Sequence, residues 1–544
     1  MSTPSVLRRL AATGSQLALE RQAIKVCKEA GMIGGQSPLE IVATVRTVRR
    51  LGTTTAGVVN SAAKHGSRVA FVDERGSTTF ADLDRRTNAI AHEWRRRGLR
   101  AGDGVAILCR NHTGLAEAFF AAGKLGARIV MLNTDFAGPQ LRDAMAREGV
   151  ELLVVDEEFL DRLEGLEPRC GIFRAWTDRP GSDTLDALAE AGRATLPAQP
   201  EKHAKIVVLT SGTTGTPKGA PRSEPRSLVS VGAILERVPF KANGTVELCA
   251  PMFHSLGLGY MMLLMALGTT MVLRRRFDPE RTLASIAEHH SDGMIVVPIM
   301  LQRMVDLGED AFEIYDVSSM RTIMVAGSQL GSELAQRGLA AFGPSIHNLY
   351  GSTEVAYATI ATPEDLAVEP SCVGRPCLGA VVRILDERGA ELPTGATGRI
   401  FVRNAIGFDG YTGGGHKEII DGLMSTGDVG HFDDAGRLFI DGRDDEMIVS
   451  GGENVFPREV EELLEQDAGV NEVAVIGVDD AAYGHRLRAF VVRDDGATLT
   501  EDDLRDHVKA NLARYKVPRE VVFLERLPRN ATGKVLKREL RLID

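Results

Sequence analysis

The segment with the clearest chemistry covers residues 206–219 and reads Ile-Val-Val-Leu-Thr-Ser-Gly-Thr-Thr-Gly-Thr-Pro-Lys-Gly. Its first part is a β-branched run typical of a strand, and the rest is a loop rich in glycine and hydroxyl side chains. Glycines let the backbone come close to a ligand, and a lysine supplies a positive charge. These are groups that bind phosphate oxygens. The candidate phosphate-binding residues are Thr210, Ser211, Gly212, Thr213, Thr214, Gly215 and Lys218.

A flexible surface linker is the alternative for this segment, but a linker would not explain a strand that enters the loop and a lysine that leaves it. The segment also differs from a Walker loop, because Lys218 is followed by Gly219 rather than by Ser or Thr. Pro217, Pro221 and Pro225 exclude the helix that should come next in a Walker loop. We therefore predict a phosphate-binding loop of another type.

At this loop the chain resembles the adenylate-forming superfamily, which contains acyl-CoA synthetases, adenylation domains of peptide synthetases and beetle luciferases. Each further motif is weak alone, but the motifs occur in family order and span nearly the whole chain from about residue 65. They are Pro251-Met-Phe-His-Ser-Leu-Gly, Tyr350-Gly-Ser-Thr-Glu354, Ser425-Thr-Gly-Asp428, Gly442-Arg-Asp-Asp445, Ser450-Gly-Gly-Glu-Asn-Val-Phe-Pro457 and Pro528-Arg-Asn-Ala-Thr-Gly-Lys534.

The resemblance implies a reaction in which a carboxylate attacks the α-phosphorus of ATP, and it implies ATP, Mg²⁺ and CoA as cofactors. Two like charges about 4 Å apart repel by about 1 kcal/mol in water and by about 4 kcal/mol at an effective dielectric constant near 20. Cations must therefore line the path of the carboxylate. In the family pattern Glu354 coordinates Mg²⁺ and Thr353 contacts the α-phosphate. Lys534 is the implied catalytic lysine, which reaches the α-phosphate and the carboxylate.

The same resemblance implies a nucleotide site. Asp428 matches the aspartate that accepts hydrogen bonds from the ribose hydroxyls, with Arg443 as a second contact. The match around the adenine is looser, because the family usually has Gly-Ala or Gly-Glu after the first glycine, where this chain has Ser328-Gln329 after Gly327. The residues implied to enclose the adenine or to continue toward the phosphates are Gly327, Ser328, Asn348, Tyr350, Gly351 and Ser352.

His254 lies where the family places an aromatic residue or a histidine near the substrate carboxylate, which implies a catalytic role. A structural role is the alternative, because a lone histidine beside apolar residues is often part of a core. Members that activate amino acids carry an aspartate here to pair with the ammonium group. The absence of that aspartate argues against an α-amino acid as the substrate.

In this family a small C-terminal domain rotates after adenylation, and Asp445 matches the hinge residue. The rotation withdraws Lys534 and presents residues 450–455 to the incoming thiol. Gly451 and Gly452 would let the pantetheine arm of CoA pass close to the backbone.

The elements that must position these residues alternate between short apolar runs and helical patterns. Strands separated by helices predict parallel pairing in an α/β sheet covered on both faces. After about residue 380 the chain changes to short strands and glycine-rich turns, which predicts a small β-rich subdomain. Among the expected elements are strands at 69–72, 104–108, 127–132, 294–297, 322–325, 345–348, 381–385, 398–402 and 437–440, and helices at 80–97 and 115–125.

Three parts are expected along the chain. Residues 1–50 form an N-terminal helical extension, residues 51–444 a large ATP- and acyl-binding domain, and residues 445–544 a small mobile α+β domain. For the last part we expect a helix from Pro457, strands at 473–478, 487–492 and 521–524, and a second helix with a capping box near Thr500.

Composition excludes several classes of protein. The 544 residues include 44% hydrophobic and 25% charged residues, close to globular averages, which excludes disorder as the main state. The net charge of −10 argues against a general nucleic-acid binder. Six scattered cysteines predict neither a disulfide framework nor a zinc site, and the N-terminus has no secretory signal, so a cytoplasmic location is expected. The uncharged residues 255–273 are predicted to form a buried helix and strand rather than a membrane span, because glycines interrupt them.

Two regions are basic. Residues 1–50 carry eight basic and three acidic side chains, which suits either a helix that contacts anionic lipid or a solvated helix packed on the body. Residues 514–541 carry nine basic and three acidic side chains. This second region suits a polyanionic ligand, and a solvated basic helix is the alternative that the Gly533-Lys534 turn argues against.

The resemblance favours an acyl-CoA synthetase that acts on a medium- or long-chain fatty acid rather than an aryl acid. An acyl-AMP ligase or adenylation enzyme that delivers to a carrier protein is the alternative. Luciferase chemistry, a nucleotide-binding regulator without turnover and a membrane protein are more distant alternatives. The sequence leaves open a homodimer and a peripheral membrane contact through the basic N-terminus. The acyl tunnel is expected among Gly257, Gly259, Met261, Val297, Pro298, Val325 and Val355.

Overall fold

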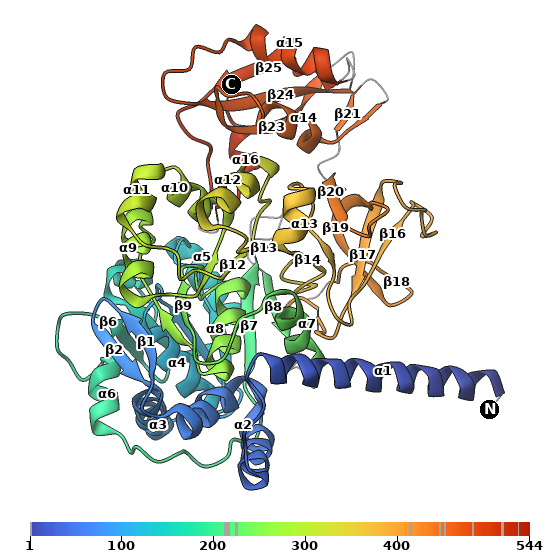
Figure 1. Cartoon of the computed structure of the whole chain (residues 1–544). Coiled ribbons are helices and arrows are strands. Elements are labelled where there is room, and N and C mark those ends of the chain that lie inside the picture. Colours follow the sequence, from blue (N-terminus) through green and yellow to red (C-terminus); the bar gives the residue numbers. More distant parts are fainter. Residues whose placement is uncertain are drawn as a thin grey trace.

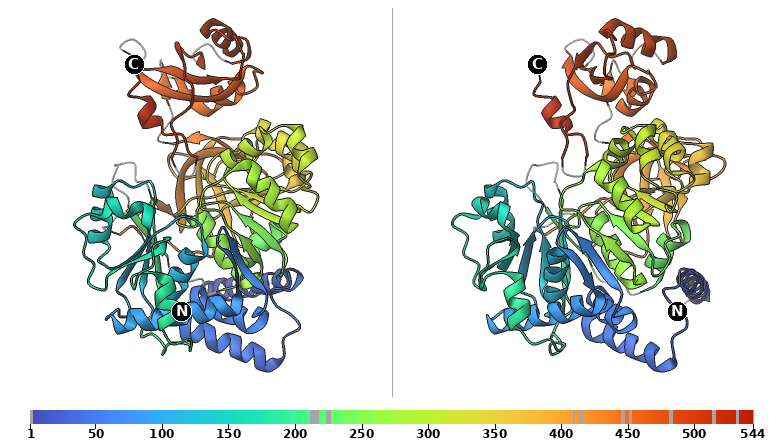
Figure 2. Two further views of the ribbon diagram at one scale, coloured as in Figure 1. Left: turned by 90° about the vertical axis from the view of Figure 1, so that its left-hand side faces the viewer. Right: turned by 60° about the vertical axis from the view of Figure 1, so that its left-hand side comes forward.

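The computed structural model describes residues 3–210, 218–222, 227–408, 410–412, 416–444, 448–450, 453–480, 484–512, 516–530 and 533–543. These residues form a large N-terminal body and a smaller C-terminal domain at one end of it (Figure 1). The body contains two large sheets that lie side by side with helices over their outer faces (Figure 2). The predicted fold class, an α/β body with a smaller α+β domain, is confirmed.

The first large sheet has six strands in the order β6-β5-β3-β4-β7-β8, and all neighbours are parallel except β7 and β8. Its strands are mostly apolar, as is typical of parallel strands that are buried on both faces. The bounds are β3 (Gly104–Leu108), β4 (Arg128–Met131), β5 (Val150–Asp156), β6 (Ile172–Trp176), β7 (Lys205–Thr210) and β8 (Lys218–Arg222).

The second large sheet has nine strands in the order β15-β14-β13-β12-β11-β9-β10-β1-β2. Its centre is parallel and its two ends are antiparallel. The bounds are β1 (Val69–Asp73), β2 (Gly76–Thr79), β9 (Thr245–Leu248), β10 (Thr270–Val272), β11 (Gly293–Val296), β12 (Thr322–Val325), β13 (Ile346–Tyr350), β14 (Thr359–Ala361) and β15 (Arg375–Pro376).

Several helices of the body begin at residues whose side chains cap the first turn. For example, the Asp278 side chain accepts a hydrogen bond from the Arg281 backbone N–H, and Pro279 occupies the first turn of α9. The bounds are α3 (Phe80–Arg96), α4 (Thr113–Lys124), α5 (Gly138–Arg147), the 3₁₀-helix η1 (Glu157–Leu163), α6 (Leu185–Ala191), α7 (Val229–Arg237), α8 (Ser255–Leu267), α9 (Pro279–His289), α10 (Pro298–Val305), α11 (Glu309–Ile314), α12 (Ser332–Phe342) and α13 (Pro363–Val368).

The uncharged segment 255–273 forms helix α8 and strand β10, as predicted. Helix α8 ends at Gly268, which has a left-handed φ of 67°. Among the described helices, none combines the length and the apolar content that crossing a bilayer requires.

A small antiparallel sheet follows the body, as the change in sequence texture predicts. Strand β19 is its centre and pairs with β17, β18 and β20. The bounds are β16 (Val381–Leu385), β17 (Gly398–Arg403), β18 (Ile419–Ile420), β19 (Leu423–Phe432) and β20 (Leu438–Arg443).

The C-terminal domain packs its helices against a sheet in the order β22-β21-β24-β23, with β25 paired to β24. The Thr500 capping box opens α15, as predicted. The bounds are β21 (Ile448–Ser450), β22 (Glu453–Val455), α14 (Pro457–Leu464), β23 (Val470–Asp480), β24 (Gly484–Arg493), α15 (Glu501–Asn511), β25 (Glu520–Phe523) and α16 (Lys537–Leu540).

Two helices precede the sheets, α1 (Thr3–Glu29) and α2 (Pro38–His65). Helix α1 packs its second half against α7, where Ala23 comes so close to Gly232 that a Cβ atom there would lie 2.8 Å away. The N-terminal half of α1 projects beyond the body (Figure 1). The boundary predicted after residue 50 falls inside α2, near Gly52, whose φ of 81° and ψ of 165° interrupt the helix. The division of the chain into three domains stays a prediction.

Candidate active site

A cavity of about 1960 Å³ lies between the two parts of the molecule. Its wall includes the loops after β12 and β13, helix α8, strands β19 and β20, and the turn that carries Lys534 in the C-terminal domain. The cavity therefore brings together motifs that lie up to several hundred residues apart. The predicted residues that line it are His254, Gly327, Ser328, Asn348, Tyr350, Gly351, Ser352, Thr353, Glu354, Asp428, Arg443 and Lys534.

One wall carries the predicted nucleotide residues. Strands β19 and β20 place Asp428 directly opposite Arg443, with an Arg443 nitrogen 3.7 Å from a carboxylate oxygen of Asp428. The Tyr350 hydroxyl donates a hydrogen bond of 2.6 Å to Asp428 Oδ2. Gly327 adopts a φ of 103°, and a Cβ atom there would lie 3.2 Å from Val297. The wall offers an aromatic ring, a carboxylate and a guanidinium, which suit a base, a ribose and a phosphate.

The pKa of Asp428 is affected by charged side chains of both the body and the C-terminal domain. Burial raises the pKa of Asp428 above its usual value, while the Tyr350 hydroxyl and the charges of Arg443, Lys534 and Lys417 oppose the rise. The influence of Lys534 shows that the C-terminal domain brings this lysine close to the predicted ribose-binding carboxylate.

Glu354 lies in the turn after β13 and has hydroxyl donors on both carboxylate oxygens. Tyr411 donates to Oε1 over 2.5 Å and Ser352 donates to Oε2 over 2.9 Å. Burial alone would raise the pKa of Glu354, but these hydrogen bonds and the charge of Lys417 outweigh it and lower the pKa below its usual value. The carboxylate is therefore ionised at neutral pH. Each oxygen keeps a lone pair, so Glu354 fits a hard cation such as Mg²⁺.

Lys534 follows a tightly held turn. Gly533 has a φ of 78° and is so close to α10 that a Cβ atom there would lie 2.4 Å from Ile299 Cγ2. Arg529 donates to the Gly533 carbonyl over 2.6 Å and pairs with Glu472 over 2.9 Å. The Lys534 backbone N–H donates to Asn530 Oδ1 over 2.9 Å. These contacts hold the backbone of Lys534 at the wall of the cavity.

The two parts of the molecule also meet at a polar contact. Gln329, in the loop after β12, donates a hydrogen bond of 3.0 Å to Glu462 in α14. On the same helix, Arg458 forms ion pairs with Glu462 over 3.1 Å and with Glu465 over 2.9 Å. The C-terminal domain thus rests on the body beside the predicted adenine-binding loop.

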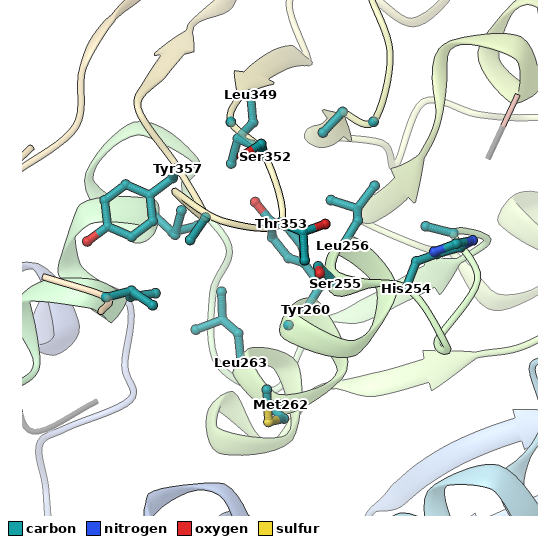
Figure 3. A pocket seen from close by; sticks show the side chains of 18 of the residues that line it. His254, Ser255, Leu256, Tyr260, Met262, Leu263, Leu349, Ser352, Thr353 and Tyr357 are labelled. Carbon is teal, nitrogen blue, oxygen red and sulfur yellow. The ribbon is translucent and has the colours of Figure 1, made fainter. Parts of the chain in front are cut away.

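His254 lies immediately before α8 and faces the cavity (Figure 3). Burial lowers the pKa of His254 to about 4, so its ring is neutral at physiological pH. Its Nε2 atom is buried and forms no hydrogen bond with the described residues. A neutral ring with a free polar atom can accept or donate a single hydrogen bond to a substrate.

The predicted acyl tunnel is only partly correct. Gly259 and Val297 line the cavity, whereas Gly257, Met261, Pro298, Val325 and Val355 do not. Because a helix repeats every 3.6 residues, only some side chains of α8 face the cavity, and the others face the core. Gly257 is packed against the backbone of Pro251, and Met261 is fully buried in the core. The side chains of α8 that do line the cavity include Ser255, Leu256, Tyr260, Met262 and Leu263, most of which are visible in Figure 3.

The cavity continues away from the nucleotide wall to helix α2 and the loop that precedes it. Apolar side chains from the first half of α2 form this distal end, among them Ile41, Val45 and Val48. None of these residues was predicted to line the tunnel, because residues 1–50 carry no family motif.

The predicted phosphate loop closes a hairpin. Thr210 ends β7 and pairs with Lys218, which begins β8. The Gly219 N–H donates to Thr412 Oγ1 over 3.0 Å, and the Thr412 hydroxyl donates to Glu148 over 2.7 Å. These bonds fix the exit of the loop.

Eight predicted site residues lie outside the described part of the chain, so their positions are not reported. They are Ser211, Gly212, Thr213, Thr214, Gly215, Asp445, Gly451 and Gly452.

Sequence reasoning missed Tyr411 and Lys417, which act on Glu354. Both lie between the Glu354 and Asp428 motifs, in a stretch without a recognised pattern. One signal was available for Lys417, because it is the first lysine after Lys241 in a chain whose basic residues are mainly arginine.

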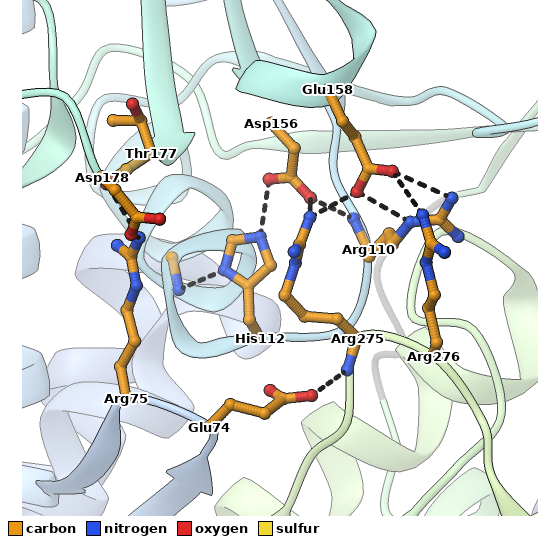
Figure 4. Close-up of polar contacts among 11 residues, drawn as sticks. Glu74, Arg75, Arg110, His112, Asp156, Glu158, Thr177, Asp178, Arg275 and Arg276 are labelled. Carbon is orange, nitrogen blue, oxygen red and sulfur yellow. Dashed lines mark hydrogen bonds and ion pairs between the residues drawn. The ribbon is translucent and has the colours of Figure 1, made fainter.

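An ionic network joins the two large sheets (Figure 4). Asp156 at the end of β5 accepts hydrogen bonds from His112 Nε2 over 2.7 Å, from the Arg110 N–H over 3.0 Å and from Arg275 over 3.4 Å. Arg275 follows β10 of the second sheet and also pairs with Glu158. Since Asp156 and His112 are fully buried, their charges and polar atoms depend on these partners.

Comparison with known proteins agrees with this geometry. A family described as AMP-binding enzyme matches residues 58–412, and the C-terminal domain of AMP-binding enzymes matches residues 459–534. The chain belongs to the AMP-binding enzyme family. This confirms the predicted membership of the adenylate-forming superfamily, whose CoA ligases use ATP, Mg²⁺ and CoA.

Two relatives and one solved structure illustrate what this AMP-binding enzyme is similar to. Indoleacetate–CoA ligase from Aromatoleum aromaticum is 31% identical over 85% of this chain and 92% of its own length. The fatty acid–[acyl-carrier-protein] ligase ScoC from Streptomyces coeruleorubidus is 30% identical over 87% of this chain and 92% of its own length. The crystal structure of ATP-bound MatB from Rhodopseudomonas palustris has a TM-score of 0.80 and 27% identity, and covers 89% of this chain and 98% of MatB.

Proposed function

We propose that this AMP-binding enzyme is an ATP-dependent acyl-CoA synthetase that activates a medium- or long-chain fatty acid. The observation that carries the proposal is the continuous cavity. One end holds Lys534, Asp428 and Glu354, and the other is lined by apolar side chains of α8 and α2. A carboxylate with a long apolar tail fits these two ends together.

In the first step the carboxylate oxygen of the acid attacks the α-phosphorus of ATP, a P–O bond forms, and pyrophosphate leaves. Lys534 supplies positive charge to the α-phosphate and the carboxylate as negative charge moves between them. Asp428 and Arg443 hold the ribose, Tyr350 covers the base, and Thr353 contacts the α-phosphate. Neutral His254 hydrogen-bonds the acid and adds no charge to the apolar end of the cavity.

Glu354 would hold Mg²⁺, with Ser352 and Tyr411 orienting its carboxylate. The bound metal neutralises charge on the phosphate oxygens. The hydrogen bonds to Ser352 and Tyr411 keep Glu354 in one orientation while the nucleotide enters.

In the second step the sulfur of CoA attacks the acyl carbon of the acyl-AMP, the C–O bond to phosphate breaks, and AMP leaves. Rotation about Asp445 would withdraw Lys534 and bring Gly451 and Gly452 to the cavity. A carrier protein is the second candidate acceptor, and the similarity to the carrier-protein ligase ScoC favours testing it.

The experiment is to measure AMP formation with ATP, Mg²⁺ and a panel of acids, with CoA or a phosphopantetheinyl carrier protein as acceptor. We expect CoA-dependent AMP formation that is faster with dodecanoate and palmitate than with butyrate, ferulate or indoleacetate. Preference for an aryl acid would contradict the proposed substrate. Release of AMP only with the carrier protein would favour the second candidate acceptor.

A further inference from the structure

We propose that the first half of α2 docks on an anionic lipid bilayer and admits the acyl chain from the bilayer into the distal end of the cavity. The proposal rests on the fatty-acid ligase function proposed above and names the surface from which the substrate comes.

The outer face of α2 exposes aliphatic side chains to solvent. Leu39 is 81% exposed and Val42 is 64% exposed. Ile41 and Val45, on the neighbouring face, are 48% and 45% exposed. Four large aliphatic side chains within seven residues form an apolar patch, which marks an interaction site more often than scattered exposed residues do.

Positively charged side chains follow the aliphatic ones on the same face of α2. Arg46 and Arg49 follow Leu39 and Val42 at helical spacing, so the four side chains lie on one side of α2. Both arginines are exposed, and among the described residues neither forms an ion pair with an acidic side chain. Aliphatic residues followed by arginines on one helix face suit the acyl and headgroup layers of an anionic membrane.

The one acidic residue in this part of the helix, Glu40, caps the start of α2. Glu40 forms a capping box with Ser37, in which the Ser37 backbone N–H donates to the Glu40 carboxylate over 2.7 Å. These hydrogen bonds lower the pKa of Glu40 and keep its charge at the N-terminus of α2, away from the arginines. The charge on the outer face is therefore positive, in a chain whose net charge is −10.

The inner face of the same segment belongs to the cavity. Ile41, Thr44, Val45 and Val48 line it, whereas Leu39, Val42, Arg46 and Arg49 do not. Ile41 and Val45 are both exposed to solvent and part of the cavity wall. An acyl chain that leaves a bilayer at this patch would therefore meet the aliphatic side chains of Ile41 and Val45 where it enters the cavity.

The position of α2 in the molecule agrees with this role. Helix α2 lies at the end of the body opposite the C-terminal domain (Figure 1). Docking through α2 would leave that domain free to rotate. The match to the AMP-binding enzyme family begins at residue 58, so the docking face precedes the part of the chain that is shared with the family.

The test is co-sedimentation of the full chain with vesicles, without ATP, CoA or acid. We expect binding to vesicles that contain phosphatidylglycerol, and weaker binding to vesicles of phosphatidylcholine alone. Leu39→Asp combined with Val42→Asp should weaken binding about tenfold or more, because charged side chains do not enter the acyl layer. Arg46→Gln combined with Arg49→Gln should remove the preference for the anionic vesicles.

Ile314→Asp combined with Val368→Asp is the matched control, because these aliphatic residues are 72% and 66% exposed on α11 and α13. This control should bind vesicles like the wild type. Turnover of palmitate carried in vesicles should fall in the Leu39/Val42 variant, while turnover of dissolved octanoate should not change.

Three results would overturn the proposal: no vesicle binding by the wild type, equal binding by the Leu39/Val42 variant and the wild type, or light scattering that shows this face joining two copies of the chain. Vesicle binding without turnover of any fatty acid would instead retain the docking face and refute the proposed function, so the two failures are distinguishable.

Discussion

Lys534 and Glu354 face the same cavity from different parts of the chain, and their surroundings differ. Glu354 is fixed by hydrogen bonds from Ser352 and Tyr411, whereas the Lys534 side chain extends from a held backbone turn. This difference suits the proposed reaction, in which Glu354 stays in the cavity throughout and Lys534 is withdrawn after the first step.

We expect Lys534→Ala to slow pyrophosphate release at least about 100-fold, because a preorganised charge on the reacting phosphate is lost. The variant should convert supplied acyl-AMP and CoA to thioester at nearly the wild-type rate. The two half-reactions are measured separately, with Lys509→Ala as a control on the same domain. Equal loss of both half-reactions would contradict the role of Lys534.

At the residue scale, motifs predicted which side chains face the cavity, but not what holds them. The sequence placed Asp428 and Arg443 in one site by resemblance, and the β19–β20 pairing explains why residues fifteen positions apart lie opposite each other. Tyr411 could not be predicted, because its partner Glu354 lies 57 residues away and no periodic pattern connects them.

At the scale of elements, the turn at Gly533 couples the C-terminal domain to α10. Its φ of 78° and its contact with Ile299 both require the absence of a side chain. The turn therefore decides whether Lys534 reaches the cavity.

Gly533→Ala should lower the rate of adenylation about tenfold or more, because the new methyl group meets Ile299 and the left-handed backbone is strained. Ile299→Ala in the same chain should restore part of the rate, since it removes the steric contact but not the backbone strain. Pyrophosphate release by the single and double variants measures this. Absence of any recovery in the double variant would show that backbone strain alone is responsible.

The network around Asp156 joins strands of two sheets. Burial alone would raise the pKa of Asp156, but His112, the Arg110 N–H and Arg275 outweigh it and lower the pKa. A carboxyl whose pKa is lower in the folded state stabilises the fold above its unfolded pKa. That stabilisation is lost as the pH falls through the lowered, folded value.

We expect Asp156→Asn to reduce the free energy of unfolding by about 1–3 kcal/mol at neutral pH, because it removes the buried carboxylate that accepts hydrogen bonds from His112, the Arg110 N–H and Arg275. The difference from wild type should begin to shrink as the pH falls below about 4, where Asp156 of the unfolded chain becomes protonated, and should be lost below the lower pKa of the folded state. Urea unfolding at several pH values measures it, with exposed Asp161→Asn as the control. A constant difference at every pH would mean that the charge of Asp156 is not responsible.

The element boundaries were predicted well where apolar runs are bounded by turn residues. The strand expected at 69–72 is β1 (Val69–Asp73), and the helix expected at 80–97 is α3 (Phe80–Arg96). The helix and the strand expected within residues 255–273 are α8 (Ser255–Leu267) and β10 (Thr270–Val272). The order of the strands in the sheets could not be predicted from the sequence, since β1 pairs with β10, which lies about two hundred residues later.

At the scale of the whole molecule, Lys534 lies at the cavity and the C-terminal domain rests on the body through Gln329 and Glu462. Under the proposed function, we assign this arrangement to adenylation. The second step would need the domain to turn, and the predicted hinge, Asp445, lies just after β20.

Asp445→Pro should spare adenylation and slow thioester formation about tenfold or more, because proline fixes the φ angle that a hinge must change. Pyrophosphate release and CoA-dependent AMP formation are compared in the same preparation. Asp445→Ala is the matched control, because it removes the same side chain without fixing the φ angle. Normal overall turnover of the Asp445 variant would refute the hinge assignment.

The six cysteines have one practical consequence. Five are buried, and Cys249 is partly buried. Burial raises the pKa of Cys27 and Cys372 to about 11 and that of Cys377 to about 12, and it raises the pKa of the other three thiols too. At neutral pH the native thiols are therefore poor nucleophiles. Exposed Glu387→Cys and Asp495→Cys would then accept a pair of fluorescent dyes against a quiet background, so that domain rotation could be followed as a change in energy transfer during single turnovers.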